Sequence, residues 1–550
     1  MPSERHAKAL ISRLSRVLAN NPIQSSKAPT RLAGMITQPI RSIHTTSPVV
    51  LSDRPPARDG DELFQPLEPA DLRAFWDKAS SEASTQEMLG NSPAATASLS
   101  ELVSTIVDKK SHKGAVELGQ IAQRFCDLYE TLDSDARNKF LVLLSRDFCM
   151  PKGTTESAAR SYMDSMAQSK DFAQNALLAH KLRDSLTPLY ADLFDNINRL
   201  PEGFAFLVHL RTEMLALLAG PQKDSAMQAM SDFLMRRLQT WIVGTLDLKR
   251  ITWNSPACTI EKLEQYESVH AVRSWMDIKR RLGNGRRCFG FFHRNAPKEP
   301  LIFVWVALTD QIPDNVQSIL QEREQPKANE ANAKCAIFYS ISSQVGLSRV
   351  DLGNFLIKRV VSVLRSEMPN IEVFCTLSPM PRFRSWLEKL LTPENLKSPP
   401  QDINLTDAEK QALVNCVPSA ATWTAALKHL IDSRGWTSEQ TNMEAMEPVV
   451  RTLGAHYLLK AKRAGSSNNA ADPVANFHLR NGSCLHRVNW RGDTSYRGLR
   501  QSLGLMCNYN YVLDRIEDNS ESYVSKGTIA TSGSDPYIAR VLSSQTKPKL

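Results

Sequence analysis

A serine and a histidine that lie one hundred positions apart are the best candidates for chemistry in this sequence. Ser378 follows the apolar run Ile371 to Leu377 and precedes Pro379, while His478 lies within the segment Pro473 to Gly482. An imidazole can exchange a proton near neutral pH, and a hydroxyl can bind an anion or relay a proton. Each residue also has an ordinary alternative, because serine before proline is a common turn residue and an isolated histidine is often structural.

The elements that must position these two side chains can be read from the apolar pattern. The run Ala336 to Ile341 predicts a strand, Asp351 to Met368 a helix and Ile371 to Leu377 a second strand, and such a unit places its two strands side by side in a mixed sheet. Ligand sites of open sheets lie at the carboxyl ends of strands, which is where Ser378 falls. Around His478, two asparagines and a glycine break the periodicity and favour the end of a strand.

The turn between the first strand and the helix, Ser343 to Asn354, could hold an anion. Backbone N–H groups in the first turn of a helix lack partners and carry the positive end of the helix dipole, so a pyrophosphate fits there. Gly346 would let a ligand approach the main chain, and Arg349 would add positive charge. A plain connection in which Asp351 caps the helix explains the same residues, and both interpretations stay open. The loop is neither a G-x-G-x-x-G motif nor a Walker loop.

The remainder of the chain divides into a helical part and a mixed part. Helical spacing recurs from Leu118 to Tyr129 and from Phe140 to Phe148, and it predicts an all-helical domain over residues 53–239 whose role is packing. Two short β-rich runs, Cys288 to Phe292 and Leu301 to Leu308, predict a hairpin. A mixed α/β domain is therefore predicted over residues 240–547.

Composition excludes several classes of protein. The 550 residues, 42% hydrophobic and 23% charged, are typical of a soluble enzyme of two or three domains, and no run approaches the roughly 20 apolar residues of a membrane span. The net charge of +9 is scattered, without the basic and aromatic clusters that bind nucleic acid, but it suits a polyanionic small ligand. The nine cysteines lack zinc-binding spacing, so no metal site is predicted and free thiols in a reducing compartment are favoured.

Several longer passages, spread over roughly Thr240 to Tyr523, closely resemble malonyl-CoA decarboxylases. They are Val269 to Arg281, Val306 to Thr309, Phe338 to Ser342, Leu356 to Val361, Leu377 to Pro379 and Asn476 to Leu479. The resemblance implies an α+β fold, with an N-terminal all-α helix bundle and a C-terminal acetyltransferase (GNAT)-like mixed α/β domain. It also implies conversion of malonyl-CoA to acetyl-CoA and CO2 without a cofactor, because the thioester carbonyl can itself accept the electrons that CO2 leaves behind.

The same resemblance assigns the site. Ser378 and His478 would form the catalytic pair, with the serine engaging the malonyl carboxylate or relaying a proton and the histidine donating a proton to the nascent acetyl group. The residues that would lie along bound malonyl-CoA are Ser348, Arg349, Val350, Asp351, Leu352, Gly353 and Asn354. Ser340 and Tyr511 match polar residues of the family's site, although Tyr511 could equally be a half-buried aromatic residue whose hydroxyl is satisfied. Asp351 stands where relatives carry glutamate, and its reach is shorter. The stretch Gly504 to Tyr511 should pack beside His478 as either a strand or a helix.

Both ends of the chain resemble targeting signals. Residues 1–52 contain one acid, Glu4, among many arginines and serines, and Lys8 to Leu18 would form an amphipathic helix, which is typical of a mitochondrial transit peptide. A disordered basic tail is the alternative. The last three residues, 548–550, resemble a Ser-Lys-Leu peroxisomal signal with proline in the first position. The predicted location is the mitochondrial matrix, with peroxisome and cytoplasm as further compartments, and the family resemblance implies a homotetramer assembled through the helical domain.

Two other functions remain open at this point. An acyl-CoA N-acetyltransferase would use the same loop and sheet to hold acetyl-CoA, but it needs a cleft for an amine acceptor. A non-catalytic acyl-CoA-binding or scaffold protein would rely on its helical half.

Overall fold

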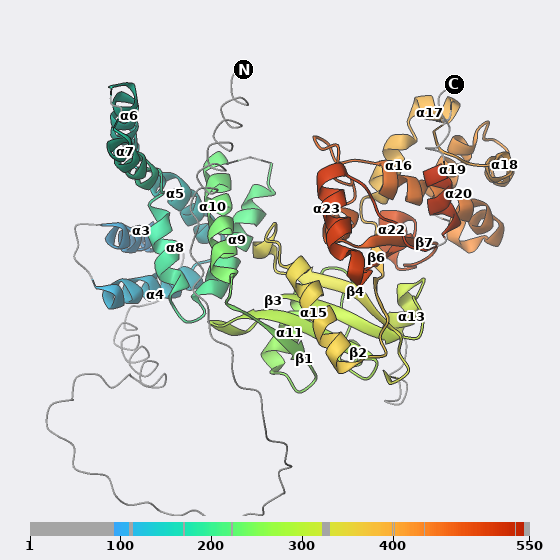
Figure 1. Cartoon of the computed structure of the whole chain (residues 1–550), viewed down its shortest axis with the longest axis horizontal. Helices are drawn as coiled ribbons and strands as arrows, with labels where there is room; N and C mark the ends of the chain where they lie inside the picture. The colour runs from blue at the N-terminus through green and yellow to red at the C-terminus, as the bar shows by residue number, and fades with distance from the viewer. Residues whose placement is uncertain are drawn as a thin grey trace, which may run out of the picture. The chain divides into compact units, whose positions relative to one another are not determined.

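A computed structural model describes residues 93–108, 114–168, 171–221, 224–321, 330–398, 400, 402–433, 435–533 and 535–543 (Figure 1). The predicted targeting segments, 1–52 and 548–550, lie outside these ranges. No helix within the described ranges combines the length and the apolar character needed to cross a bilayer.

The first part of the described chain is entirely helical. Its helices are α3 (Pro93–Val107), α4 (Ala115–Thr131), α5 (Ser134–Asp147), α6 (Lys152–Gln168), α7 (Phe172–Ser185), α8 (Tyr190–Asn198), α9 (Gly203–Leu218) and α10 (Ser225–Ile242). Asp133 caps α5 by accepting a hydrogen bond from Ala136 N, and Phe125 and Phe140 meet in the core. The predicted helix bundle is confirmed.

The second part contains one eight-stranded mixed sheet. Its strands are β1 (Leu246–Ile251), β2 (Arg286–His293), β3 (Ala296–Thr309), β4 (Cys335–Ser343), β5 (Val373–Thr376), β6 (Ser378–Pro379), β7 (Cys484–Asn489) and β8 (Met506–Asn510). They are arranged in the order β1-β2-β3-β4-β5-β8-β6, and β7 also pairs with β8. The hairpin β2–β3 is antiparallel, as predicted.

The strand–helix–strand prediction is also correct. Strand β4 pairs in parallel with β5, and α15 (Gly353–Glu367) connects them. An all-helical first part followed by a mixed sheet with helices is the predicted α+β arrangement, so the predicted fold class is confirmed. The stretch that could have been a strand or a helix contains β8, which pairs with β5 and β6 along one edge and with β7 along the other.

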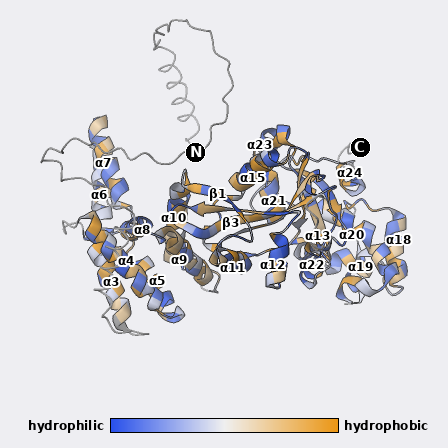
Figure 2. Cartoon of the chain, turned by 90° about the horizontal axis from the view of Figure 1, so that it is seen from below, coloured by the Kyte–Doolittle hydropathy of each residue, from blue (hydrophilic) through white to orange (hydrophobic). Residues whose placement is uncertain are grey.

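The two faces of the sheet pack against different helices. Val304, Val306 and Phe338 belong to the core that contains α15 and the N-terminal helices, while Trp305 and Ile337 belong to the opposite core. That second face is covered by α11 (Ala257–Tyr266), α12 (Trp275–Arg281) and α13 (Val316–Gln321). Side chains of a strand alternate between faces, and the central strands are apolar on both sides (Figure 2).

A group of helices between β6 and β7 forms a third core. They are α16 (Phe383–Leu390), α17 (Pro393–Lys397), α18 (Asp407–Cys416), α19 (Trp423–Asp432), α20 (Gln440–Lys460) and α21 (Pro473–Arg480). After β7 come α22 (Tyr496–Ser502), α23 (Ile516–Lys526) and α24 (Pro536–Ser543). This core includes Leu479, Val488 and Leu505, so it joins α21 to the strands that flank the candidate site.

Candidate active site

His478 lies in a helix, and the predicted strand end is wrong. Asp472 caps α21 by accepting hydrogen bonds from the N–H groups of Val474 and Ala475, and Pro473 occupies the first turn. A capping aspartate followed by proline is a strong helix start, which outweighs the irregular asparagine spacing further along. The short helix presents His478 inward, with only 4% of the residue exposed.

Ser378 and His478 meet, although one hundred residues separate them. The Ser378 Oγ lies 3.1 Å from His478 Nε2 and 2.9 Å from Thr376 Oγ1, and all three residues are buried. Thr376 Oγ1 also accepts a hydrogen bond of 3.1 Å from Tyr509 N, which fixes the end of β5 against β8. The serine hydroxyl is therefore held in place from two sides.

The other nitrogen of the imidazole is also occupied. His478 Nδ1 lies 2.9 Å from Tyr511 Oη, and the ring stacks on Tyr509 with 4.8 Å between centroids. With both nitrogens engaged and one face covered, the ring has a fixed orientation. Ser378, His478 and Tyr511 form one continuous chain of hydrogen bonds.

Burial controls the protonation of this chain. Desolvation lowers the pKa of His478 to about 3, so the imidazole is neutral at physiological pH when the site holds no anion. Burial likewise raises the pKa of Tyr511, which keeps its hydroxyl protonated. A negative charge brought next to the ring would stabilise the imidazolium and raise the pKa of His478.

The Ser378–His478 pair lies at the wall of a cavity of about 730 Å³. Ser340 of β4 also lines this cavity, together with five of the seven predicted loop residues. Those five are Ser348, Arg349, Val350, Asp351 and Gly353. The cavity therefore joins the catalytic candidates to the predicted ligand loop.

The other three predicted residues lie elsewhere. Leu352 is buried in the core beneath α15, with 3% exposed. Asn354 and Tyr511 line a neighbouring cavity of about 700 Å³, and Asn481 lines both cavities. Tyr511 thus reaches the chemistry only through His478.

The alternative in which Asp351 caps the helix is wrong. The residue before α15 is Leu352, and no side chain caps this helix; Asp351 is exposed on the cavity wall. The first N–H groups of α15 are consequently not occupied by that carboxylate, which favours the anion-binding interpretation of the loop.

The ligand loop is anchored to the N-terminal helices. Arg211 of α9, which is completely buried, donates from Nη1 to the carbonyl oxygens of Gly346 and Ser348, the latter at 3.1 Å, and from Nε to Ser231 O at 3.1 Å. A Cβ on Gly346 would lie 1.9 Å from Val208 O, so only glycine allows this close approach.

A second anchor acts on the next turn of the loop. Arg349 has a left-handed backbone, with φ of 69°, and its guanidinium pairs with Asp232 of α10. Gln239 Nε2 donates to Arg349 O at 3.3 Å. Sequence reasoning assigned the helical part no role in the site, although Arg211 falls on the same helical face as Leu207 and Met214, where an arginine is unusual.

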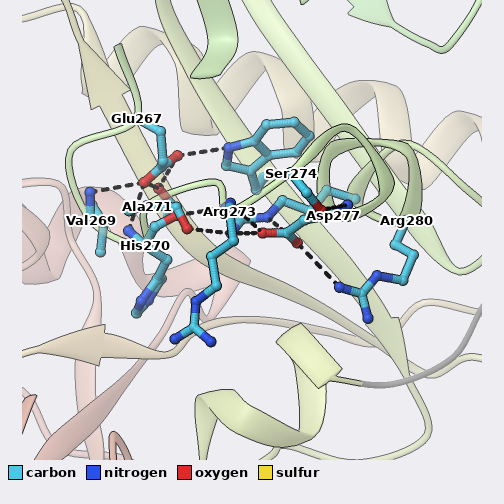
Figure 3. A network of polar contacts seen from close by, with 11 residues as sticks. Glu267, Val269, His270, Ala271, Arg273, Ser274, Asp277 and Arg280 are labelled. Carbon is cyan, nitrogen blue, oxygen red and sulfur yellow. Dashed lines mark hydrogen bonds and ion pairs between the residues drawn. The ribbon is translucent and has the colours of Figure 1, made fainter. Parts of the chain in front are cut away.

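Ser340 has a partner that the sequence did not reveal. Its Oγ lies 2.8 and 3.0 Å from the two carboxylate oxygens of Glu267, which also accepts from Trp305 Nε1 at 2.8 Å. The same carboxylate accepts from the backbone N–H groups of Val269 and His270, both at 2.8 Å (Figure 3). Glu267 therefore positions Ser340 and the following loop together, and its only sequence signal is its place two residues before the passage that begins at Val269.

Two family models match the chain. The malonyl-CoA decarboxylase C-terminal domain matches residues 244–549, and the N-terminal domain of the same family matches residues 152–242. The chain belongs to the malonyl-CoA decarboxylase family. Mitochondrial malonyl-CoA decarboxylase of Anser anser anser is 38% identical over 433 residues, which cover 78% of this chain and 84% of that protein. The Rattus norvegicus protein of the same name is 36% identical, and the match covers 78% of this chain and 87% of that protein.

Solved structures agree with these matches. The crystal structure of malonyl-CoA decarboxylase from Rhodopseudomonas palustris is 34% identical, with a TM-score of 0.68 over 81% of this chain and 99% of that one. The Agrobacterium vitis malonyl-CoA decarboxylase is 30% identical, with a TM-score of 0.67 over 82% and 100%. Sequence and structure thus place both halves of the chain in the malonyl-CoA decarboxylase family.

The Tyr511 hydroxyl gives a first testable prediction for this malonyl-CoA decarboxylase family member. Tyr511→Phe removes the hydrogen bond to His478 Nδ1 and leaves the ring orientation less defined, so we expect kcat for malonyl-CoA to fall roughly tenfold or more. Tyr509→Phe is the matched control, since no hydrogen bond joins the Tyr509 hydroxyl to His478 within the described residues, while its ring still covers the imidazole. Equal losses in both variants would contradict a role for the Tyr511 hydroxyl.

Proposed function

We propose that this chain converts malonyl-CoA to acetyl-CoA and CO2, with Ser378 and His478 as its catalytic residues. Family membership supports the reaction and makes the chain a carboxy-lyase. The observation that carries the residue roles is the 3.1 Å contact between Ser378 Oγ and His478 Nε2 at the wall of the cavity that the ligand loop also lines.

The reaction needs three things from these residues. The malonyl carboxylate must be held so that its bond to the α-carbon can break into the thioester carbonyl, which accepts the electron pair as CO2 leaves. The Ser378 hydroxyl donates its hydrogen to Thr376 Oγ1 in the structure, and by rotating it can donate that hydrogen to the carboxylate instead, while His478 Nε2 stays beside its oxygen. The resulting enolate then takes a proton at the α-carbon, which completes acetyl-CoA.

The proton comes from His478 in this proposal. The bound carboxylate raises the pKa of the buried imidazole, which therefore takes up a proton as substrate binds. When CO2 leaves, that stabilising charge moves onto the thioester, and an imidazolium in a buried site is a strong acid next to a basic α-carbon. Proton transfer restores the neutral ring, and one proton from solvent is consumed in each turnover.

The remaining contacts hold the coenzyme. The N-terminus of α15 and the loop before it can accept the pyrophosphate, since Gly346 lets the loop pack closely against α9 and no side chain caps the N–H groups of the first turn. Arg349 is held at the cavity by Asp232, so its charge is fixed beside the phosphates.

A direct assay tests this proposal. Purified protein incubated with malonyl-CoA alone should release one CO2 for each acetyl-CoA formed. An acyl-CoA N-acetyltransferase would instead require an amine and would release free CoA, and a non-catalytic binding protein would do neither. Binding of malonyl-CoA without any release of CO2 would contradict the proposed reaction.

The low pKa of His478 predicts a dependence of stability on pH. In the unfolded chain a histidine titrates near 6.5, whereas in the folded site the pKa is about 3. Between these two pH values the unfolded state therefore binds more protons than the folded state. Above pH 6.5 His478 does not affect the free energy of unfolding, and as the pH drops towards 3 it lowers this free energy progressively. Between pH 7 and 4.5, the free energy of unfolding should fall by roughly 2 kcal/mol less in His478→Asn than in the wild type, as measured by urea unfolding. A loss of the same size in both proteins would contradict the buried, neutral assignment.

The location and assembly of the protein are further proposals. Relatives named as mitochondrial support a mitochondrial protein, with residues 1–52 as the transit peptide and the matrix as its destination. The ending 548–550 supports a smaller peroxisomal fraction, and protein that is not imported would account for a cytoplasmic one. We also propose that residues 53–239 assemble a homotetramer and that residues 240–547 form the catalytic domain. Light scattering on the purified chain tests the assembly.

A further inference from the structure

A third cavity, of about 510 Å³, lies on the face of the sheet that α11, α12 and α13 cover. It is bounded by α12, the end of α13 and the loop that leads into α22. Val269 is the one residue that lines both this cavity and the catalytic one. The proposed reaction uses none of the charged groups in it.

Arginine dominates the lining of this cavity. Arg273, Arg280, Arg281 and Arg497 all line it, against two carboxylates, Asp277 and Asp493. Asp277 is neutralised by Arg281, which binds it through two contacts of 3.1 and 3.2 Å. Four guanidinium groups against two carboxylates leave the cavity with a net positive charge. Arg280 also pairs with Asp277, and Arg497 Nη1 donates to the carbonyl oxygens of Ser268 and Val269.

The other carboxylate is also occupied. Asp493 Oδ1 accepts hydrogen bonds from Gln317 Nε2 and from Ser495 N, both at 2.9 Å.

Two of the arginines are free to bind a ligand. Arg280 lies 3.8 Å from Asp277, too long for a hydrogen bond, and its side chain is 41% exposed. Within the described residues, the Arg273 guanidinium has neither a hydrogen bond nor an ion pair.

A buried imidazole supplies an independent observation. His270 is 8% exposed and lines the cavity, and its Nε2 is buried with no hydrogen-bond partner among the described residues. Figure 3 shows its ring and the Arg273 guanidinium extending to the same side of the Glu267 network. A buried polar atom left without a partner is costly, and a ligand oxygen would satisfy it.

We propose that this cavity is a binding site for a small polyanion, either a phosphate or a di- or tricarboxylate, separate from the catalytic cavity. Arg273, Arg280 and Arg497 would provide charge-assisted hydrogen bonds from the rim, and His270 Nε2 a hydrogen bond from the floor. The volume suits a small ligand. The excess of positive charge excludes an ammonium group, so the cavity does not provide the amine-acceptor cleft of an acetyltransferase.

Calorimetry on the full chain tests this proposal with two probes, inorganic pyrophosphate and malonate. We expect saturable binding of at least one, which also identifies the ligand chemistry, and a loss of affinity of tenfold or more in the double variant Arg273→Ala, Arg280→Ala. Arg273→Lys, which keeps the positive charge, should lose less affinity than the double variant. Arg500→Ala is the matched control, because this arginine lies on α22 and donates to Tyr496 Oη without lining the cavity.

The catalytic cavity must be excluded as the source of the signal. Arg349→Ala removes the guanidinium that lines the catalytic cavity, and binding that persists in this variant but not in the double variant supports the proposal. Absence of saturable binding, or equal affinity in the wild type and the double variant, would overturn it. Since the readout is binding and not turnover, either result is independent of whether malonyl-CoA is decarboxylated.

Discussion

His478→Asn is expected to lower kcat for malonyl-CoA decarboxylation about a thousandfold, because general acid catalysis by a positioned side chain contributes on the order of a hundredfold to ten-thousandfold. Asparagine fills most of the same volume and can still hydrogen-bond to Ser378, but it cannot carry the proton to the α-carbon. Burst and steady-state measurement of CO2 release would give the change.

Binding must be measured in the same variant. In the proposed mechanism His478 contacts only the acyl end of the ligand, so the affinity for acetyl-CoA should stay within a few fold. His486→Asn is the matched control, since His486 is a half-buried histidine of β7 that lines none of the cavities described above. Turnover retained in His478→Asn would remove this residue from the mechanism.

Arg211→Met is expected to have the second largest effect, and it lies outside the predicted catalytic domain. Methionine fills the buried space but leaves the loop carbonyl oxygens of Gly346 and Ser348 without their donor, whereas Ser231 O keeps its helical partner within α10. We expect the free energy of unfolding to fall by roughly 3 kcal/mol or more, because each buried acceptor left unpaired costs about 1 to 3 kcal/mol. A thermal or urea unfolding curve would measure this loss.

A positioning role in the ligand loop predicts a kinetic change as well. At a temperature where Arg211→Met remains folded, KM should rise about tenfold while kcat changes little, because Ser378 and His478 are not touched. Arg211→Lys keeps the positive charge but has fewer hydrogen-bond donors, so its KM should lie between those of the wild type and Arg211→Met. Arg236→Met, an exposed arginine on α10, is the control. Lower stability with unchanged KM would show that Arg211 supports the fold but not the loop.

The sequence predicted those parts of the fold that rest on local patterns. The apolar runs of β4 and β5 and the amphipathic helix between them identify a parallel pair without any knowledge of tertiary contacts. The same local reasoning failed at His478, because the N-terminal cap Asp472 and Pro473 were not read as a helix start. At Asp351 it left two interpretations open, and the structure favours the one in which this carboxylate lies on the cavity wall and does not cap α15.

The site itself was only partly predictable, because it depends on contacts between distant segments. Ser378 and His478 could be paired from the family resemblance, and the structure places them 3.1 Å apart. Glu267 contacts Ser340, 73 positions away, and Arg211 contacts Gly346, 135 positions away. No local periodicity encodes such contacts. Arg211 carried a weak signal, a charge on an apolar helical face, which becomes informative only when its partner carbonyls are known.

Strand β8 has a consequence for how the chain is made. It comes near the end of the sequence but sits inside the sheet, with β5 and β6 on one side and β7 on the other. A ribosome must therefore have synthesised β8 and enough residues after it to carry Met506–Asn510 out of the exit tunnel before β5 can find this neighbour. Until then the growing polypeptide exposes an unpaired backbone edge, which is a template for association with other chains. Nascent chains halted before Met506 should consequently depend on chaperones, and truncated products should aggregate instead of persisting as soluble, inactive proteins.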